Sequence, residues 1–349
     1  MMDAIHIVAL GARTPVGLDA AGSAAAVRAG ISRIVLHPFM ADQLNENVKG
    51  AIDGAFDAGI LGWERMAALA GFALAQVTAP IAAAKPGAVL PVLLAMPEER
   101  PGFSAHDERC ITNKLLAAQA DLGRPVDIRV SGRGHAGGLE AMVDAATRIR
   151  AGQHDVCIVG GVDSYFDFDT LDWLQEHRQL STGESRAGFP PGEAAGFVAL
   201  ASARACRTLR LPSLGVLRSS GTAQESRLIK GDLASLGRGL ADAIASALQG
   251  LRLPEQSPDV MYCDINGERY RSEEWGLAIL RTPHAVRKLD FVAPVDCWGD
   301  VGAATGPLLC MLALRSWARG YAEGPRALVW AGSEAGLRAA LVLEATDGR

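Results

Sequence analysis

Short, continuous apolar segments alternate with segments of helical period along most of the chain. The apolar segments are rich in Val, Ile and Leu and have the length of strands that are covered on both faces. They span residues 5–10, 89–95, 155–159, 197–201, 260–263, 327–330 and 339–344. Apolar residues at three and four spacing predict helices over residues 63–77, 106–120, 139–150, 233–249 and 308–319. This alternation predicts an α/β fold in which helices pack on sheets.

The two halves of the chain repeat one order of features. Residues 127–131 predict a strand that enters a glycine-rich turn and a helix, and the next strand, 156–159, meets Gly160-Gly161. In the second half, a strand over 291–295 enters the glycine-rich stretch 299–306 and a helix, and the strand 327–330 meets Gly332. We interpret this as a weak internal repeat with halves 1–205 and 206–349. No flexible linker separates the halves, so we expect one shared core.

Composition and charge exclude some classes of partner. The net charge of −5 and the lack of a clustered basic face argue against nucleic-acid binding. Residues 5–10 are too short for a secretory signal, and the apolar stretch 77–94 is broken by Lys85 and three prolines, so we expect neither export nor a membrane span. The prediction is a cytoplasmic, soluble protein.

Four segments follow one another in a characteristic order. The chain opens with IVALGARTPVG (7–17) and VRAGIS (27–32), and continues with SGRGHAGG (131–138) and GFPPGEAAGF (188–197). These segments resemble those of β-ketoacyl synthases, enzymes of the thiolase superfamily, across residues 5–205. The segment VMYCDING (260–267) is a weaker match in the second half. The resemblance implies the thiolase fold, which has five layers in the order α-β-α-β-α and two pseudo-duplicated halves.

The resemblance also identifies the positions where such enzymes carry a catalytic cysteine and two histidines. His135 stands at the position of the cysteine and Asn266 at that of the first histidine. Asp300 or Gly299 stands at that of the second histidine, depending on a one-residue gap. Decarboxylative condensation needs a thiolate at a helix N-terminus and donors that stabilise an enolate. We therefore expect His135, Asn266 and Asp300 to form a site that does not condense acyl chains.

Two classes of function stay open. One is a non-condensing accessory protein that forms a homodimer, pairs with a ketosynthase-like subunit as chain length factors do, or acts as a scaffold or adaptor for a protein client. A variant of it keeps the tunnel and binds an acyl chain or an acyl carrier protein without turnover. The alternative is an active acyltransferase, decarboxylase or hydrolase that acts on acyl thioesters through His135. Neither class requires a cofactor or a metal ion, and we expect none.

Each candidate residue also has a structural interpretation. His135 is expected to bond to backbone at a tight turn, and the side chains of Asn266 and Asp300 to satisfy turn backbone. Glu193 is expected to tie a buried segment together, and the paired glycines 137–138 and 160–161 to allow close backbone approach.

Bulky side chains and one acidic segment complete the expectations. Trp298, Trp330 and Tyr262 should fill the former acyl tunnel and leave a small pocket near His135. The acidic, aromatic segment 163–173 lacks the spacing of a calcium loop, and we expect it over a dimer interface or a tunnel entrance.

Overall fold

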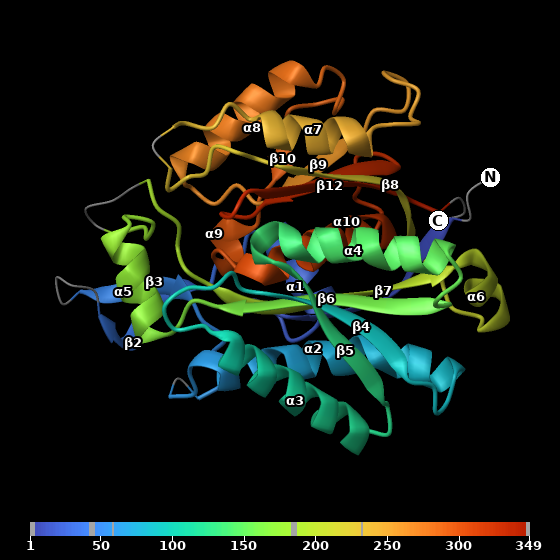
Figure 1. Cartoon of the computed structure of the whole chain (residues 1–349), viewed down its shortest axis with the longest axis horizontal. Coiled ribbons are helices and arrows are strands. Elements are labelled where there is room, and N and C mark those ends of the chain that lie inside the picture. The colour runs from blue at the N-terminus through green and yellow to red at the C-terminus, as the bar shows by residue number, and fades with distance from the viewer. Residues whose placement is uncertain (1–3, 42–45, 58, 183–186, 232, 347–349) are drawn as a thin grey trace.

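Two groups of five strands form the framework of the fold (Figure 1). The strand order is β5-β4-β6-β7-β1 in the first group and β10-β9-β11-β12-β8 in the second. In both groups the first three strands are parallel, and the other two pair antiparallel. The strands are β1 (Ile5–Arg13), β4 (Leu90–Met96), β5 (Val126–Arg133), β6 (Val156–Ser164), β7 (Glu193–Ser202), β8 (Gly215–Gln224), β9 (Val260–Cys263), β10 (Phe291–Val292), β11 (Arg326–Gly332) and β12 (Leu337–Glu344).

The computed structural model describes residues 4–41, 46–57, 59–182, 187–231 and 233–346. The helices are α1 (Ala20–Arg28), α2 (Gly62–Ala84), α3 (Ala105–Asp121), α4 (Gly134–Arg150), α5 (Phe168–Glu176), α6 (Ala203–Thr208), α7 (Arg238–Ala247), α8 (Arg269–Arg281), α9 (Val295–Trp298) and α10 (Thr305–Ala318), with a 3-10 turn at Gly302–Ala304. A separate hairpin consists of β2 (Ile34–Ala41) and β3 (Asn47–Ala51).

The helices and strands form five layers, as predicted (Figure 1). Helices α2 and α3 cover the first group of strands, α7 and α8 cover the second, and α4 and α10 lie between the two groups. The two groups also join edge to edge, because β1 pairs with β8 over three residue pairs. We propose residues 1–205 and 206–349 as the two halves, a division that falls within α6, the connection from β7 to β8.

Small residues bring the two central helices into close contact. A Cβ atom on Gly138 of α4 would lie 2.4 Å from Cδ of Pro307 in α10. A Cβ on Gly161 of β6 would lie 2.0 Å from the carbonyl oxygen of Ala303. Any larger side chain at either position would push the layers apart. The predicted role of these glycines in close approach is confirmed.

Some elements differ from the predicted ranges. Helix α4 starts at Gly134 and not at 139, so His135 lies in its first turn. Helix α7 starts at Arg238 and not at 233, because Gly237 takes a left-handed conformation with φ of 64° at its N-cap. The strand predicted over 291–295 is reduced to β10, because Pro294 ends it and α9 follows.

Helix α2 has the length and apolar composition that a membrane span requires. In this fold it covers β1, β6 and β7, and half of its most apolar window is buried. These contacts are those of a core helix. The cytoplasmic location stays a prediction.

Candidate functional site

His135 lies at the end of β5, where the chain turns directly into α4. Gly132 and Gly134 on either side of that turn have φ angles of 86° and 67°, which favour glycine. The sharp turn places the His135 side chain in the first turn of α4, between the two groups of strands. It is buried there, with 5% of its surface exposed.

The three side chains predicted for the site lie together, with His135 and Asn266 both bonded to the carboxylate of Asp300. Nε2 of His135 lies 2.8 and 2.9 Å from the two carboxylate oxygens of Asp300. Nδ2 of Asn266 donates to Oδ2 of Asp300 at 2.6 Å. The structure thus brings His135, Asn266 and Asp300 together, and it is Asp300 and not Gly299 whose side chain reaches His135. His135 comes from the first half of the chain and its two partners from the second.

The same carboxylate is held from further sides. The hydroxyl of Tyr165 donates to Oδ1 of Asp300 at 3.1 Å, and the backbone N–H of Gly302 donates to the same oxygen at 2.9 Å. The backbone N–H of Asp300 donates to Pro190 O at 2.8 Å, which fixes the loop against the GFPPGEAAGF segment. Asp300 is therefore a fixed, fully buried acceptor.

The structural interpretations of these residues hold in part. Asn266 Oδ1 accepts a hydrogen bond from Glu268 N at 3.0 Å, and Asp300 accepts one from Gly302 N, as expected of Asx side chains in turns. For His135 the expectation is wrong, since its ring bonds to a carboxylate and not to backbone. Hydrogen bonds to turn backbone therefore explain only some of the contacts of Asn266 and Asp300. They explain none of the contacts of His135 described above.

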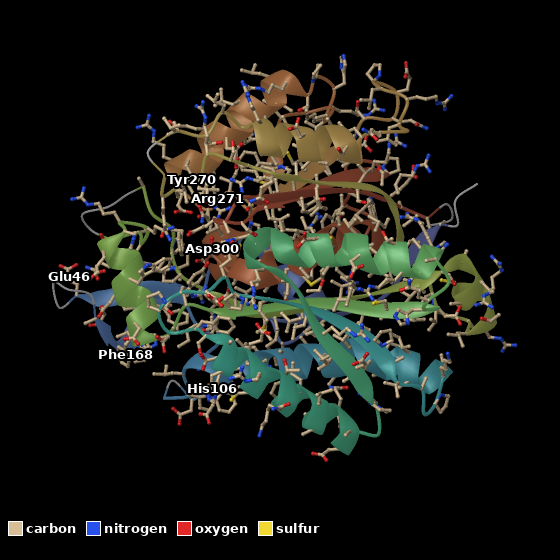
Figure 2. The ribbon with its side chains drawn as sticks, in the orientation of Figure 1. Glu46, His106, Phe168, Tyr270, Arg271 and Asp300 are labelled. Carbon is tan, nitrogen blue, oxygen red and sulfur yellow. The ribbon has the colours of Figure 1, made fainter. Side chains whose placement is uncertain are left out.

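Arg271, in α8, is the main residue of the site that sequence reasoning missed. Its Nη2 lies 3.4 Å from both ring nitrogens of His135. Its Nη1 donates to Asp264 Oδ2 at 2.5 Å and to the carbonyl oxygen of Gly332 at 2.9 Å. Figure 2 shows Arg271 and Asp300 near the start of α4. The available signal was the acidic pair Asp264 and Glu268, seven and three residues before Arg271.

The buried charges decide the protonation of His135. Burial lowers the pKa of the imidazole, but the Asp300 carboxylate and its hydrogen bond raise it more, and the net shift is upward despite the charge of Arg271. For Asp300, burial raises the pKa, yet His135 and Arg271 hold it far below its ordinary value. Both shifts have the direction expected of a hydrogen-bonded pair of opposite charges.

The side chain of Ser333 accepts a hydrogen bond from a backbone N–H group in the first turn of α4. The backbone N–H of Ala136 donates to Oγ of Ser333 at 3.0 Å, and the Ser333 hydroxyl donates to the carbonyl oxygen of Arg133 at 2.8 Å. The side chain of the N-cap residue Arg133 makes no capping bond. Ser333 thus caps α4 from the other half of the chain and uses an N–H that would otherwise be free to bind a ligand.

Two spaces of unequal size lie beside His135. A cavity of about 580 Å³ borders it on one side and is lined by Arg100, Asp163, Tyr165, Trp173, Lys230 and Glu334, among others. We call it the large cavity. A space of only about 20 Å³ lies on the other side, among Asn266, Trp298 and Leu309. That volume is close to what a single water needs.

The expectation of a small pocket is therefore only half right. Trp298 fills the inner side as predicted, and Tyr262 is buried in the central core. Trp330 does not contribute, because it packs in the outer layer with its ring stacked on Trp275 at 5.5 Å. The large cavity contradicts the expectation that the pocket beside His135 is small.

Two ion pairs frame the large cavity. Arg100 Nη2 donates to Asp163 Oδ1 at 2.6 Å, and Lys230 Nζ donates to Glu334 Oε2 at 2.7 Å. Lys230 Nζ also lies 3.6 Å from the ring centroid of Trp173 in α5. Asp163, Tyr165 and Trp173 of the acidic, aromatic segment 163–173 thus line this cavity, and the place of the segment over a tunnel entrance or a dimer interface stays a prediction.

Glu193 has the structural role that was predicted. Both of its carboxylate oxygens bind the guanidinium of Arg65, at 2.5 and 2.7 Å, and Oε1 also accepts from the backbone N–H of Asp53 at 2.7 Å. All of these groups are buried, so the carboxylate is compensated in full. Among the described residues, no cluster of three His, Cys, Asp or Glu side chains is arranged to hold a metal ion.

Comparison with known proteins places this geometry in context. Residues 135–205 match the family model of the β-ketoacyl synthase N-terminal domain. Among curated proteins, none matches the sequence significantly.

Solved structures match over almost the whole chain. One is a chain of a type II polyketide synthase acyl carrier protein in complex with its ketosynthase, with a TM-score of 0.82, 13% identity and coverage of 99% of this chain and 100% of that one. The ishigamide ketosynthase/chain length factor matches with a TM-score of 0.69 and 21% identity, and the match covers 98% of this chain and 99% of that one. The structure of the ketosynthase ApeO in complex with its chain length factor ApeC, from Xenorhabdus doucetiae, matches with a TM-score of 0.75 and 15% identity. That match covers 99% of this chain and 98% of that one. The shared fold is that of ketosynthases.

Proposed function

Because this chain is a β-ketoacyl synthase-like protein with the thiolase fold, we propose that it is a non-condensing accessory subunit. In this role it pairs with a ketosynthase-like partner, as a chain length factor does. The observation that carries the proposal is the buried pair of His135 and Asp300, with Nε2 of the histidine 2.8 Å from the carboxylate. This pair stands where the resemblance places an acylated cysteine.

The chemistry of the pair opposes condensation. An acyl group is carried by a thiolate, and His135 offers instead an imidazole whose Nε2 lies 2.8 Å from the Asp300 carboxylate. Condensation also develops negative charge on an enolate, which donors must stabilise. The nearest groups include the Asp300 carboxylate, whose charge would repel that enolate. The space of about 20 Å³ behind His135 has no room for an acyl chain.

The edge of the sheet supports a role in pairing. Strand β5 ends the strand order of the first group, so on one side it has no neighbouring strand among the residues the structure describes. A free edge is a template for a strand of another chain. Two of the similar structures, those of the ishigamide protein and of ApeO with ApeC, combine a ketosynthase with a chain length factor. When the ketosynthase-like subunit is absent, two copies of this chain can form a homodimer through the same edge.

The large cavity gives the accessory role a possible ligand. Its volume of about 580 Å³ lies in the range of small-molecule sites, and His135 and Trp173 are part of its lining. We propose that it receives an acyl group or the arm of an acyl carrier protein without turnover. The opposite charges of Lys230 and Glu334 in this cavity are paired with each other. The contacts to an acyl group would therefore come from the apolar side chains of the lining.

One observation favours the alternative, an enzyme that acts on acyl thioesters. His135 lines the large cavity and has a carboxylate partner, an arrangement that orients an imidazole for acid–base catalysis. The guanidinium of Arg271, 3.4 Å from both ring nitrogens, weighs against a base at this position. Steady thioester hydrolysis that is lost in His135→Asn would establish the enzyme.

Pairing is tested by co-expression with a ketosynthase-like subunit of the same organism. We expect a stable one-to-one complex in size-exclusion chromatography with light scattering, and chain elongation that depends on the cysteine of the partner. His135→Asn should leave elongation by the complex unchanged, because the accessory role needs no nucleophile or base at this position. Loss of elongation in that variant, with the complex intact, would contradict the proposal.

A further inference from the structure

Three arginines surround a second cavity, of about 420 Å³, which no part of the proposed function uses. Arg28 comes from α1, Arg315 from α10 and Arg319 from the turn after α10, and Tyr321 also lines the cavity. The cavity is also lined by alanines, at positions 21, 24 and 25 of α1 and at position 29 directly after it. We call this space the arginine cavity.

These arginines have no carboxylate partner. In the ranges that the structure describes, none of Arg28, Arg315 and Arg319 forms an ion pair, whereas the buried Arg13, Arg65 and Arg338 each bind an acidic side chain. Arg28 instead lies over the ring of Tyr321, 3.7 Å from its centroid. Nε of Arg315 is buried and has no hydrogen-bond partner. A buried donor without an acceptor is costly, so the site is incomplete as it stands.

The ends of the helices account for only part of this charge. Arg28 lies in the last turn of α1 and Arg315 in the last turn of α10, where the helix dipole favours a cation. Arg28 and Arg319 are exposed to solvent and Arg315 is half-buried, so the cluster presents its positive charge at the surface. The protein as a whole has a net charge of −5, so the cluster does not reflect general basicity.

The arginine cavity is remote from the site around His135. Helix α10 starts at Thr305, five residues after Asp300, and its 14 residues end at Ala318. At 1.5 Å per residue the helix is about 21 Å long. The arginine cavity lies at its C-terminal end, and the His135–Asp300 pair lies near its N-terminal end. The two sites therefore do not share a ligand of ordinary size.

We propose that the arginine cavity binds a phosphorylated ligand through its phosphate oxygens. The planar guanidinium offers paired N–H groups that match phosphate geometry, and three of them suit a group with two or more negative charges. The volume of about 420 Å³ fits a small organic phosphate. The same phosphate chemistry occurs in soluble phosphate esters and in lipid headgroups, and the experiment separates these two sources.

The test measures binding of inorganic pyrophosphate by calorimetry at constant ionic strength, and sedimentation with vesicles of phosphatidic acid and phosphatidylcholine. We expect binding to pyrophosphate, to the phosphatidic acid vesicles, or to both, which identifies the source. Arg315→Gln and Arg319→Gln should each weaken it about tenfold, the effect of losing one charge-assisted contact. Arg281→Gln removes an exposed arginine elsewhere, bonded only to the carbonyl of Leu277, and should leave binding unchanged.

A second readout keeps the test independent of folding. Without ligand, Arg315→Gln should keep or slightly raise the melting temperature, because it relieves repulsion within the cluster. With pyrophosphate, the wild type should gain stability and Arg315→Gln should not. The proposal is overturned if neither probe binds, or if Arg315→Gln and Arg319→Gln bind as tightly as the wild type and Arg281→Gln.

Discussion

One ion pair determines what the residues of the site do. His135 and Asp300 bond to each other at 2.8 Å in the core, and Asn266, Tyr165 and Arg271 complete the surroundings. A buried pair of this kind is strongly destabilised when one partner is lost, because the other charge stays uncompensated. We therefore expect the loss of either partner to destabilise the fold, and we propose that the same contacts keep the imidazole from reacting.

The pair predicts a pH dependence of stability. The pKa of His135 is raised above 6.5 in the folded state, so its contribution is complete below about pH 6.5 and is lost as pH rises through the folded value. We expect the free energy of unfolding to fall between pH 6 and pH 9, by about 1.4 kcal/mol for each unit by which the pKa is raised. Urea denaturation at several pH values measures this change.

His135→Asn provides the matched control for the other buried groups. The burial that raises the pKa of Glu268 is present in both proteins. His135 contributes to the lowered pKa of Asp300, so the variant changes that pKa as well, while Arg271 and Asn266 still lower it. The variant should therefore show a flatter profile over the same range. Equal slopes in the wild type and the variant would contradict the assignment of the charged pair.

At the scale of elements, the edge strand β5 carries a self-complementary charge pattern. Asp127 and Arg129 are exposed on either side of Ile128, with 55% and 64% of their side-chain surfaces accessible. If two copies pair antiparallel about Ile128, Asp127 of one lies opposite Arg129 of the other, twice over by symmetry. Opposite charges across a strand pair are stabilising, and like charges are destabilising.

Charge reversal on β5 should therefore change self-association. Arg129→Asp would place like charges opposite each other and should weaken the homodimer roughly tenfold. Combining it with Asp127→Arg restores opposite charges and should restore the dimer. Analytical ultracentrifugation of the three proteins measures the change. A double variant as weak as the single one would rule out this register.

The sequence predicts most of the helices and strands, but not all of them. The alternation of apolar runs with helical segments predicted most strands, because strands covered on both faces lose their polar alternation. Strand β8 was missed, since its residues LRSSGTAQ are mostly polar or small. The start of α4 was placed five residues late, because Gly137 and Gly138 suggest a turn, whereas in the structure they lie in the helix, packed closely against Gly132 and Pro307.

The candidate site was predictable in its members but not in its bonding. His135, Asn266 and Asp300 follow from the order of the motifs, and the fold brings them together. That Asp300 would bond to His135 at 165 residues' separation depends on the packing of the two halves, which no local pattern encodes. Arg271 and the large cavity are likewise products of tertiary structure.

At the scale of the whole molecule, the five layers place the site between two similar halves. Helix α4 brings His135 from the first half, and the segment before α10 brings Asp300 from the second. Ser333, also from the second half, caps α4. The thiolase framework is thus retained, while the interface between the halves is closed on one side of His135 and open on the other. The central claim is that this interface holds no acyl-enzyme.

Intact-protein mass spectrometry after incubation with acyl-coenzyme A and acyl carrier protein thioesters tests that claim most directly. We expect the unaltered protein to keep its mass and to release no β-ketoacyl product. His135→Cys should gain a slow acyl adduct, because the start of α4 favours a thiolate, yet it should not extend a chain. A stable acyl adduct on the unaltered protein, or a β-ketoacyl product formed by it, would contradict the account.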